Sequence, residues 1–275
     1  MQDPKPQYPF VDSVGQPVNI TRLHRGADCF LLLCGPSLAT LDLSLLRRRG
    51  AFIFAANNAA SLVRPHAVTH ADPPWRIHDS IWRDPAILKF TPHHHLEKPT
   101  RQKMPSGEFR FNPDAQPRTM PGVVGICRNQ YFSPACWLTE PTINWGNGQT
   151  AASGNGHPYC KSVMFQALKI IWLLGFHRVF LLGCDFTMDE TRPYGFNEQK
   201  TALEANTANR IYEKLAAMFR LLAPYFESVD FRIFNCNPES RLTVFPSMSY
   251  SEAIERATGT LEQEPLDCRG YYTLG

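Results

Sequence analysis

The sequence predicts an α/β fold, a Rossmann-like and mainly parallel sheet with flanking helices. Two observations lead to this prediction. Short, wholly apolar runs of strand length, such as residues 29–34 and 179–182, alternate with longer amphipathic stretches. Uninterrupted apolar runs of this length are typical of strands buried on both faces, as in a parallel sheet. The alternation of such strands with helical patterns indicates β-α-β units.

The elements follow from local patterns along the chain. Expected strands cover residues 29–34, 51–56, 65–69, 85–90, 179–182 and 229–234, and expected helices cover residues 38–46, 159–174, 202–222 and 251–257. Basic residues followed by Gly50 predict the end of the first helix, and Gly175 predicts the end of the second. The helix over residues 202–222 carries Ile211, Leu215 and Phe219 along one face.

The length of 275 residues and the 43% hydrophobic content suit one large domain with an insertion. We expect residues 1–27 to form a lead-in, residues 28–257 a single nucleotide-binding α/β domain, and residues 258–275 a tail. Within that domain, residues 91–150 are rich in Pro, Gly, Asn and aromatic residues, which predicts an irregular insertion or lid over a binding site, with short apolar pieces at residues 122–127 and 131–138 as candidate edge strands.

Composition excludes several classes of protein. The net charge of +3 is too mild to demand a nucleic-acid partner. The chain starts without a signal-peptide pattern, and no apolar window has the length of a membrane span. The eight cysteines are scattered without a Cys-x-x-Cys pair, which favours reduced thiols in a cytoplasmic protein over disulfides or a zinc site. We expect no metal ligands.

Small or polar residues follow the predicted strands, at the edge where ligands bind in open parallel sheets. They are Gly35, Pro36, Ser37, Asn57, Asn58, Asp72, Asp185, Asn237 and Ser240. Any one of them has a plain alternative as a turn-former or helix cap. Because they come from separate strands and meet at one edge, we interpret them together as a binding site.

The turn Gly35-Pro36-Ser37 has two interpretations. A strand that ends in small residues and then opens a helix offers free backbone N–H groups and a positive dipole end to a phosphate. The alternative is an ordinary strand–turn–helix corner. A second flexible stretch, which contains Asn155, precedes the predicted helix over residues 159–174, where its backbone can approach a diphosphate. It matches neither a P-loop nor a Gly-x-Gly-x-x-Gly motif.

Several motifs in order resemble those of bacterial sialyltransferases that use CMP-sialic acid and of motility-associated-factor glycosyltransferases. The motifs are Cys-Gly-Pro-Ser-Leu at residues 34–38, the Asn pair at 57–58, the segments 65–73 and 174–186, Tyr-Gly-Phe at 194–196, Asn-Thr at 206–207 and the segment 236–242. The resemblance covers roughly residues 28–245. It implies a GT-A-like single domain and transfer of a sugar from a CMP-type nucleotide-sugar donor to a hydroxyl acceptor.

The resemblance also implies roles for residues. Gly35, Pro36, Ser37 and Asn57 would line the donor nucleotide. Tyr194, together with Phe186 in place of a tyrosine, would flank the departing phosphate. The sialyltransferases carry a general-base histidine just before the Asn-Thr motif, and no histidine stands there in this chain. Glu204 is then a candidate base or an ordinary helix N-terminal acid. Asp185 and Asp72 are the rival bases.

Pyrophosphokinases of the 6-hydroxymethyl-dihydropterin type carry a similar Gly-Pro-Ser-Leu domain, so an Mg²⁺-dependent kinase with Asp72 and Asp185 as metal ligands is an alternative. A catalytically inactive nucleotide-binding module is a third. The glycosyltransferase would require no cofactor. Its expected partners are a nucleotide-sugar donor and an acceptor glycan, protein or modified nucleic acid, and a homo-oligomer is compatible with the sequence.

Overall fold

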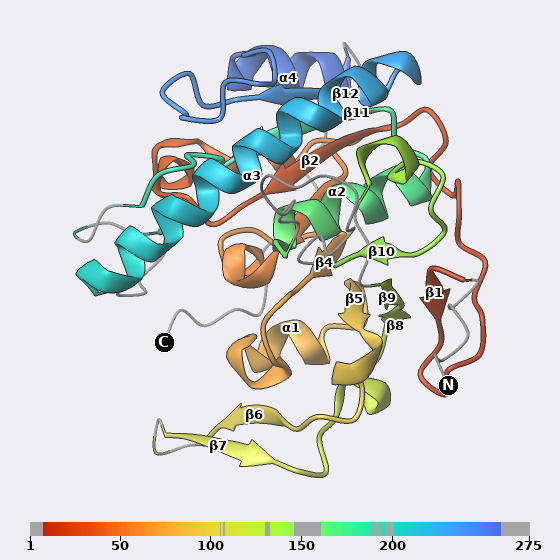
Figure 1. The fold of residues 1–275 in the computed structure, drawn as a ribbon. Coiled ribbons are helices and arrows are strands. Elements are labelled where there is room, and N and C mark those ends of the chain that lie inside the picture. The colour runs from red at the N-terminus through yellow and green to blue at the C-terminus, as the bar shows by residue number, and fades with distance from the viewer. Residues whose placement is uncertain are drawn as a thin grey trace.

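The structure is a computed structural model that describes residues 8–104, 106, 108–129, 133–145, 161–188, 191, 194–195 and 201–259. An eight-stranded sheet in the order β1-β8-β5-β4-β3-β2-β11-β12 forms its centre (Figure 1). The strands are β1 (Phe10–Val11), β2 (Asp28–Leu32), β3 (Ile53–Ala56), β4 (Ala67–Thr69), β5 (Leu88–Pro92), β8 (Val123–Ile126), β11 (Arg178–Leu182) and β12 (Arg232–Asn235). All neighbours pair in parallel except β1 and β8. This confirms the predicted fold class.

Helices cover both faces of the sheet, because successive side chains of each strand point to opposite sides. Leu31 and Phe54 belong to one core with α2 (Val163–Leu174) and α3 (Ala202–Ser228). Their neighbours Phe30 and Ile53 belong to a second core with α1 (Asp79–Arg83), α4 (Tyr250–Thr258) and several 3-10 turns. The sheet is therefore buried on both faces, as its wholly apolar strands predict.

The direction of chain winding reverses between β2 and β11. From β2 the chain moves outward through β3, β4 and β5 to β8, and it then returns through α2 to place β11 on the other side of β2. Residues Asp28 to Leu32 pair with Arg178 to Leu182 in parallel register. In open α/β sheets such a reversal leaves a crevice at the carboxyl ends of the two strands, where ligands bind.

The helix expected over residues 38–46 is a wrong prediction. The chain instead forms two 3-10 turns, Pro36–Thr40 and Leu43–Arg47. Asp42 separates them, because its Oδ1 accepts hydrogen bonds from the Ser44 backbone N–H at 3.0 Å and the Ser44 hydroxyl at 2.6 Å. Such local side-chain bonds compete with helix formation. A turn this short supplies no helix dipole for a phosphate.

The region expected to be an irregular insertion contains regular structure. Strand β8 lies inside the main sheet, between β5 and β1. A hairpin of β6 (Thr100–Lys103) and β7 (Phe109–Asn112) extends from one end of the molecule (Figure 1). The short strands β9 (Arg128–Asn129) and β10 (Ile143–Asn144) pair in parallel.

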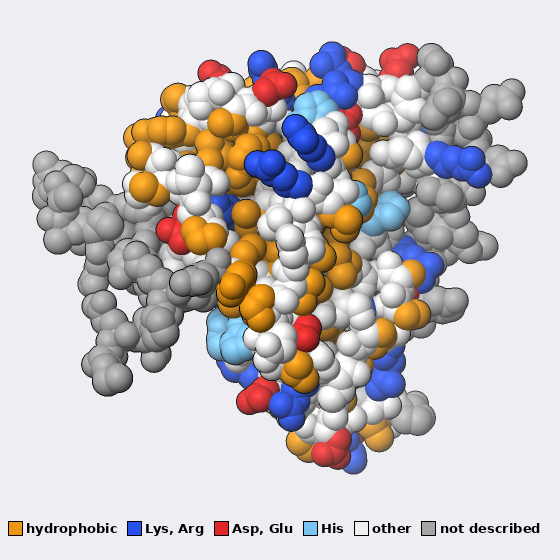
Figure 2. Space-filling view, turned by 90° about the vertical axis from the view of Figure 1, so that its right-hand side faces the viewer, with side chains coloured by type: hydrophobic (Ala, Val, Ile, Leu, Met, Phe, Trp, Pro, Cys, Tyr) orange, Lys and Arg blue, Asp and Glu red, His pale blue; other side chains and the backbone are white. Residues whose placement is uncertain are grey.

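The described surface mixes charges of both signs. On the face shown in Figure 2, basic and acidic side chains are interspersed among the coloured atoms, in agreement with the small net charge. Each cysteine in the described ranges is a free thiol. Among the helices that the structure describes, none combines the length and the apolar character needed to cross a membrane.

Candidate functional site

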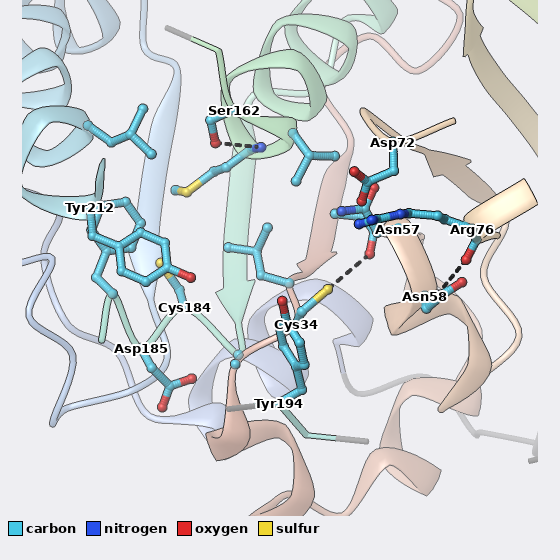
Figure 3. Close-up of a pocket in the computed structure, with 18 of the residues that line it drawn as sticks. Cys34, Asn57, Asn58, Asp72, Arg76, Ser162, Cys184, Asp185, Tyr194 and Tyr212 are labelled. Atoms are coloured by element: carbon cyan, nitrogen blue, oxygen red, sulfur yellow. Dashed lines mark hydrogen bonds between the residues drawn. The ribbon is translucent and has the colours of Figure 1, made fainter. Parts of the chain in front are cut away.

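A cavity of about 470 Å³ opens at the carboxyl ends of β2 and β11, where the winding reverses (Figure 3). Its volume is in the range of small-molecule and cofactor sites. Residues that line it come from several strand ends, from α2 and α3 and from the β6–β7 hairpin. They include Cys34, Gly35, Asn57, Asn58, Asp72, Arg76, His78, Arg101, Ser162, Met164, Asp185, Phe186, Tyr194 and Tyr212.

Gly35 is at this position because β2 and β11 approach each other closely beyond their ends. Its N–H donates to the carbonyl oxygen of Gly183 at 3.0 Å. A Cβ on Gly35 would lie 1.8 Å from Oδ2 of Asp185 and 2.4 Å from the Gly183 carbonyl oxygen. Both distances are far inside van der Waals contact, so only glycine lets the Asp185 carboxylate lie against this turn.

Asp185 holds the turn after β2 through its carboxylate. Oδ2 accepts hydrogen bonds from the Ser37 hydroxyl at 2.9 Å and the Ser37 N–H at 3.4 Å, and Oδ1 accepts one from Asn237 Nδ2 at 3.0 Å. Burial raises the pKa of Asp185, and the hydrogen bonds from Ser37 oppose that rise. With three donors on it, this carboxylate joins β2, β11 and the loop after β12.

The two asparagines after β3 make different hydrogen bonds. Asn57 adopts a left-handed backbone conformation, with φ of 50°, which asparagine tolerates better than most residues. Its Oδ1 accepts from the Ala71 N–H at 3.2 Å, and its Nδ2 has no partner among the described residues. Asn58 instead uses both ends of its amide to hold the next loop, through the Arg76 carbonyl at 2.9 Å and the His78 N–H at 3.3 Å.

Asp72 and Arg76 lie on the opposite side of the cavity from Asp185 (Figure 3). His70 fixes the backbone of this loop, since its Nδ1 donates to the Asp72 carbonyl oxygen at 2.6 Å. In the described part of the chain, neither the Asp72 carboxylate nor the Arg76 guanidinium makes a hydrogen bond or an ion pair. Arg76 is exposed. Asp72 is thus a carboxylate that is available to a ligand.

Aromatic side chains form the remaining wall. The rings of Phe186 and Tyr212 stack at a centroid distance of 5.1 Å. Phe186 is left-handed, with φ of 53°. Burial raises the pKa of Tyr212 to about 12, so its phenol stays protonated near neutral pH. Tyr194 lies beside Cys34, because the N–H of Gly195 donates to the Cys34 carbonyl oxygen at 3.0 Å.

The cavity brings together part of the set predicted from the sequence. Gly35, Asn57, Asn58, Asp72, Asp185 and Tyr194 line it. Pro36, Ser37, Asn237 and Ser240 are not among its lining residues. The Ser240 hydroxyl bonds the Asp185 carbonyl oxygen at 3.4 Å and accepts from the Leu242 N–H at 3.1 Å. Asn155 lies outside the described residues.

Glu204 lies at the start of α3, away from the cavity lining. It is exposed and forms a capping box with Thr201, in which its Oε2 accepts from the Thr201 N–H at 2.9 Å. This is the helix N-terminal alternative that its sequence position offered. We do not include Glu204 in the site.

Several residues that line the cavity were not predicted from the sequence. Arg76 and Arg101 were not recognised, since a loop and a hairpin bring them to the cavity. Ser162 caps α2 by accepting from the Met164 N–H at 3.2 Å, and it also faces the cavity. Its place directly before a helix was the signal that could have found it. Tyr212 shares the apolar face of α3 with Leu215.

No group of three or more His, Cys, Asp or Glu side chains in the described part of the chain is arranged to hold a metal ion.

No protein-family model matches the chain, and no curated protein sequence matches it.

Among solved structures, the chain is similar to the sialyltransferase CstII from Campylobacter jejuni in complex with a substrate analogue, cytidine-5'-monophosphate. The identity is 12% over 90% of this chain and 92% of that chain, with a TM-score of 0.42. A second CstII structure, with a trisaccharide acceptor and CMP, matches at 12% identity over the same shares of both chains, with a TM-score of 0.37.

The chain is also similar to the MAf glycosyltransferase from Magnetospirillum magneticum AMB-1. The identity is 12% over 95% of this chain and 37% of that longer chain, with a TM-score of 0.46. A sialyltransferase and a MAf glycosyltransferase are the two kinds of protein that the sequence motifs resemble. At TM-scores below 0.5 these similarities carry no conclusion about activity, which has to come from the residues of the cavity.

Proposed function

We propose that the chain is a glycosyltransferase that moves a sugar from a nucleotide-sugar donor of the CMP type to a hydroxyl acceptor. One observation carries this proposal. The Asp72 carboxylate, which has no partner in the described part of the chain, lines a nucleotide-sized cavity at the reversal point of a parallel sheet. The Gly-Pro-Ser-Leu motif at residues 35–38 supports a CMP-type donor.

The donor would enter at the ends of β2 and β11. Asn57 Nδ2, which has no partner among the described residues, can donate to a ribose hydroxyl or a base edge. The Tyr194 phenol can stabilise the phosphate as it leaves, because it is a hydrogen-bond donor that lines the cavity. This replaces the helix dipole that the sequence predicted after Ser37.

Asp72 is the base that we favour over Asp185. The Asp185 carboxylate already accepts three hydrogen bonds and holds the turn after β2, whereas the Asp72 carboxylate has no partner in the described part of the chain. Asp72 would accept the acceptor's hydroxyl proton while the acceptor oxygen bonds to the anomeric carbon. The bond from that carbon to the phosphate oxygen breaks, and its electron pair leaves with CMP.

Nucleotide binding tests the first half of the proposal. Thermal unfolding would be followed with CMP, UDP, GDP and ADP in the presence of EDTA. A ligand at 100 times its Kd stabilises the folded state by about 2.7 kcal/mol. We expect CMP to raise Tm without metal. If no nucleotide raises Tm, the proposal fails, and Mg²⁺-dependent release of AMP from ATP would favour the pyrophosphokinase instead.

Turnover tests the second half. Asp72→Asn should keep the Tm increase with CMP but slow the release of CMP from CMP-N-acetylneuraminic acid by about 10²–10⁴-fold, the usual contribution of a general base. Asp114→Asn is the matched control, because Asp114 is exposed and lies outside the cavity lining. Equal turnover by the Asp72 and Asp114 variants would refute the assignment of Asp72 as the base.

A further inference from the structure

The cavity opens onto a rim of aromatic and basic side chains that the proposed donor site does not use. We define the rim as Trp75, Arg76, Arg101 and Phe111. The Trp75 and Phe111 rings meet edge to face at a centroid distance of 5.8 Å. Phe111 is 64% exposed, which is unusual for a phenylalanine, and Trp75 is partly exposed. Arg76 and Arg101 both line the cavity.

Strand register explains why these four side chains gather. Arg101 and Phe111 are direct partners across the β6–β7 hairpin, and side chains of directly opposed residues lie on the same face. That face contacts the turn Pro74–Arg76, which carries Trp75 and Arg76. The rim therefore continues from the cavity, where both arginines are, to solvent, where both rings are. Asp72 lies two residues before this turn.

The chemistry of the rim fits one class of ligand. Exposed aromatic rings offer flat apolar faces on which a pyranose ring can stack, and their amphipathic surroundings suit a partly hydrated ligand. The Arg76 guanidinium has no ion pair among the described residues, and its planar donors match a carboxylate in a bidentate geometry.

We propose that the rim is the acceptor subsite and that it selects a sugar ring that carries a carboxylate. The sugar ring stacks on Phe111, the more exposed ring, beside Trp75, which holds Phe111 by its edge-to-face contact, and the carboxylate pairs with Arg76. The role of the rim as an acceptor subsite rests on the proposed function, but the binding of the sugar to the rim needs no nucleotide. A sugar bound on the rim would have its acceptor hydroxyl near Asp72, at the border between the rim and the donor cavity.

The test uses the full chain and two simple probes, methyl β-D-glucuronide and methyl β-D-glucoside, which differ in the carboxylate. Binding would be measured by saturation-transfer NMR titration, with and without CMP. We expect the glucuronide to bind more tightly. Arg76→Gln should weaken glucuronide binding by about ten-fold and leave the glucoside unchanged, since a hydrogen bond to a charged group is lost. Arg76→Lys should restore part of the preference.

Phe111→Ala should weaken both probes by about five-fold, because the stacking surface is lost for either sugar. Arg110→Gln is the matched control: Arg110 is the next residue in β7, on the opposite face of the hairpin, and its side chain is 69% exposed. It should change neither probe. Equal affinity for the two probes, or the same loss from the Arg76 and Arg110 variants, would overturn the inference.

The two proposals fail separately. If CMP does not raise Tm but the glucuronide binds and depends on Arg76, the rim stands and the donor assignment falls. If CMP binds and the glucuronide does not, the donor assignment stands and the rim inference falls. Both readouts come from the same preparation, and the Tm of each variant shows that it is folded.

Discussion

Gly35→Ala should destabilise the protein far more than the addition of one methyl group would suggest. The backbone of Gly35, with φ of −65° and ψ of 153°, is open to alanine, so conformational strain contributes nothing. The cost comes from contact: the new methyl would lie 2.4 Å from a backbone carbonyl oxygen and 1.8 Å from Oδ2 of Asp185. Neither atom is at the end of a long, flexible side chain, so the turn or β11 has to move.

The magnitude follows from the displaced groups. Overpacking of this kind costs about 1–3 kcal/mol. Displacing the Asp185 carboxylate weakens its hydrogen bonds from Ser37, at about 1.5–3 kcal/mol for a charged acceptor. Alanine restricts the unfolded chain and returns about 0.4–1 kcal/mol. We expect a net loss of about 3 kcal/mol in the free energy of unfolding, together with weaker CMP binding.

Urea unfolding followed by circular dichroism would measure this loss, and a double-mutant cycle would assign it. Asp185→Ala removes one of the two clashing groups, so the combined variant should lose less than the sum of the single losses, by about 1 kcal/mol or more. Gly26→Ala supplies the contrasting case of backbone strain without contact, since Gly26 has φ of 77° and no atom lies within 4 Å of its Cβ position. A Gly35→Ala loss below about 0.5 kcal/mol, within the usual range for surface changes, would refute the reasoning.

Two further predictions concern His70, which fixes the backbone beside Asp72, and Glu204, which caps α3. Burial lowers the pKa of His70 to about 4, whereas the same side chain in the unfolded protein has a pKa of about 6.5. Below about pH 6.5 the unfolded protein therefore binds a proton at His70 that the folded protein does not. The free energy of unfolding should fall by about 2 kcal/mol between pH 7 and pH 5 for this reason. Urea unfolding at pH 7 and pH 5 should show a smaller difference for His70→Asn, and an equal difference would contradict the assignment. Glu204→Ala should cost about 1 kcal/mol of stability through the lost cap and leave CMP release unchanged; a loss of turnover would restore Glu204 as a candidate base.

The sheet was predictable because its strands are short apolar runs whose pattern is nearly independent of context. The prediction of a helix over residues 38–46 was wrong for a local reason that is visible in the sequence. Asp42 stands two residues before Ser44, and this pair forms a side-chain turn that interrupts the apolar pattern. The hairpin went unrecognised since its polar and aromatic residues lie in a stretch rich in Pro and Gly.

A residue's place at the cavity was predictable where it depends on a strand end, and was missed where it depends on packing between distant elements. Asn57, Asp72 and Asp185 follow strands, so the sheet alone places them at one edge. Arg101 reaches the cavity only because the hairpin packs on the turn Pro74–Arg76. Ser240 looks identical in sequence to a ligand-binding serine, and only its bonds to the loop after β11 identify it as structural.

The pairing of β2 with β11 also determines when the site can form during folding. Asp28 and Arg178, which close this seam with an ion pair of 2.7 Å, are 150 residues apart in the chain. Loop-closure entropy and high contact order make such pairings slow relative to local ones. A nascent chain can pair β2 with β3 and β3 with β4 before it contains β11, but it has no cavity until the later half docks. Recovery of nucleotide binding during refolding would therefore track this one long-range pairing and lag behind the formation of the first strands.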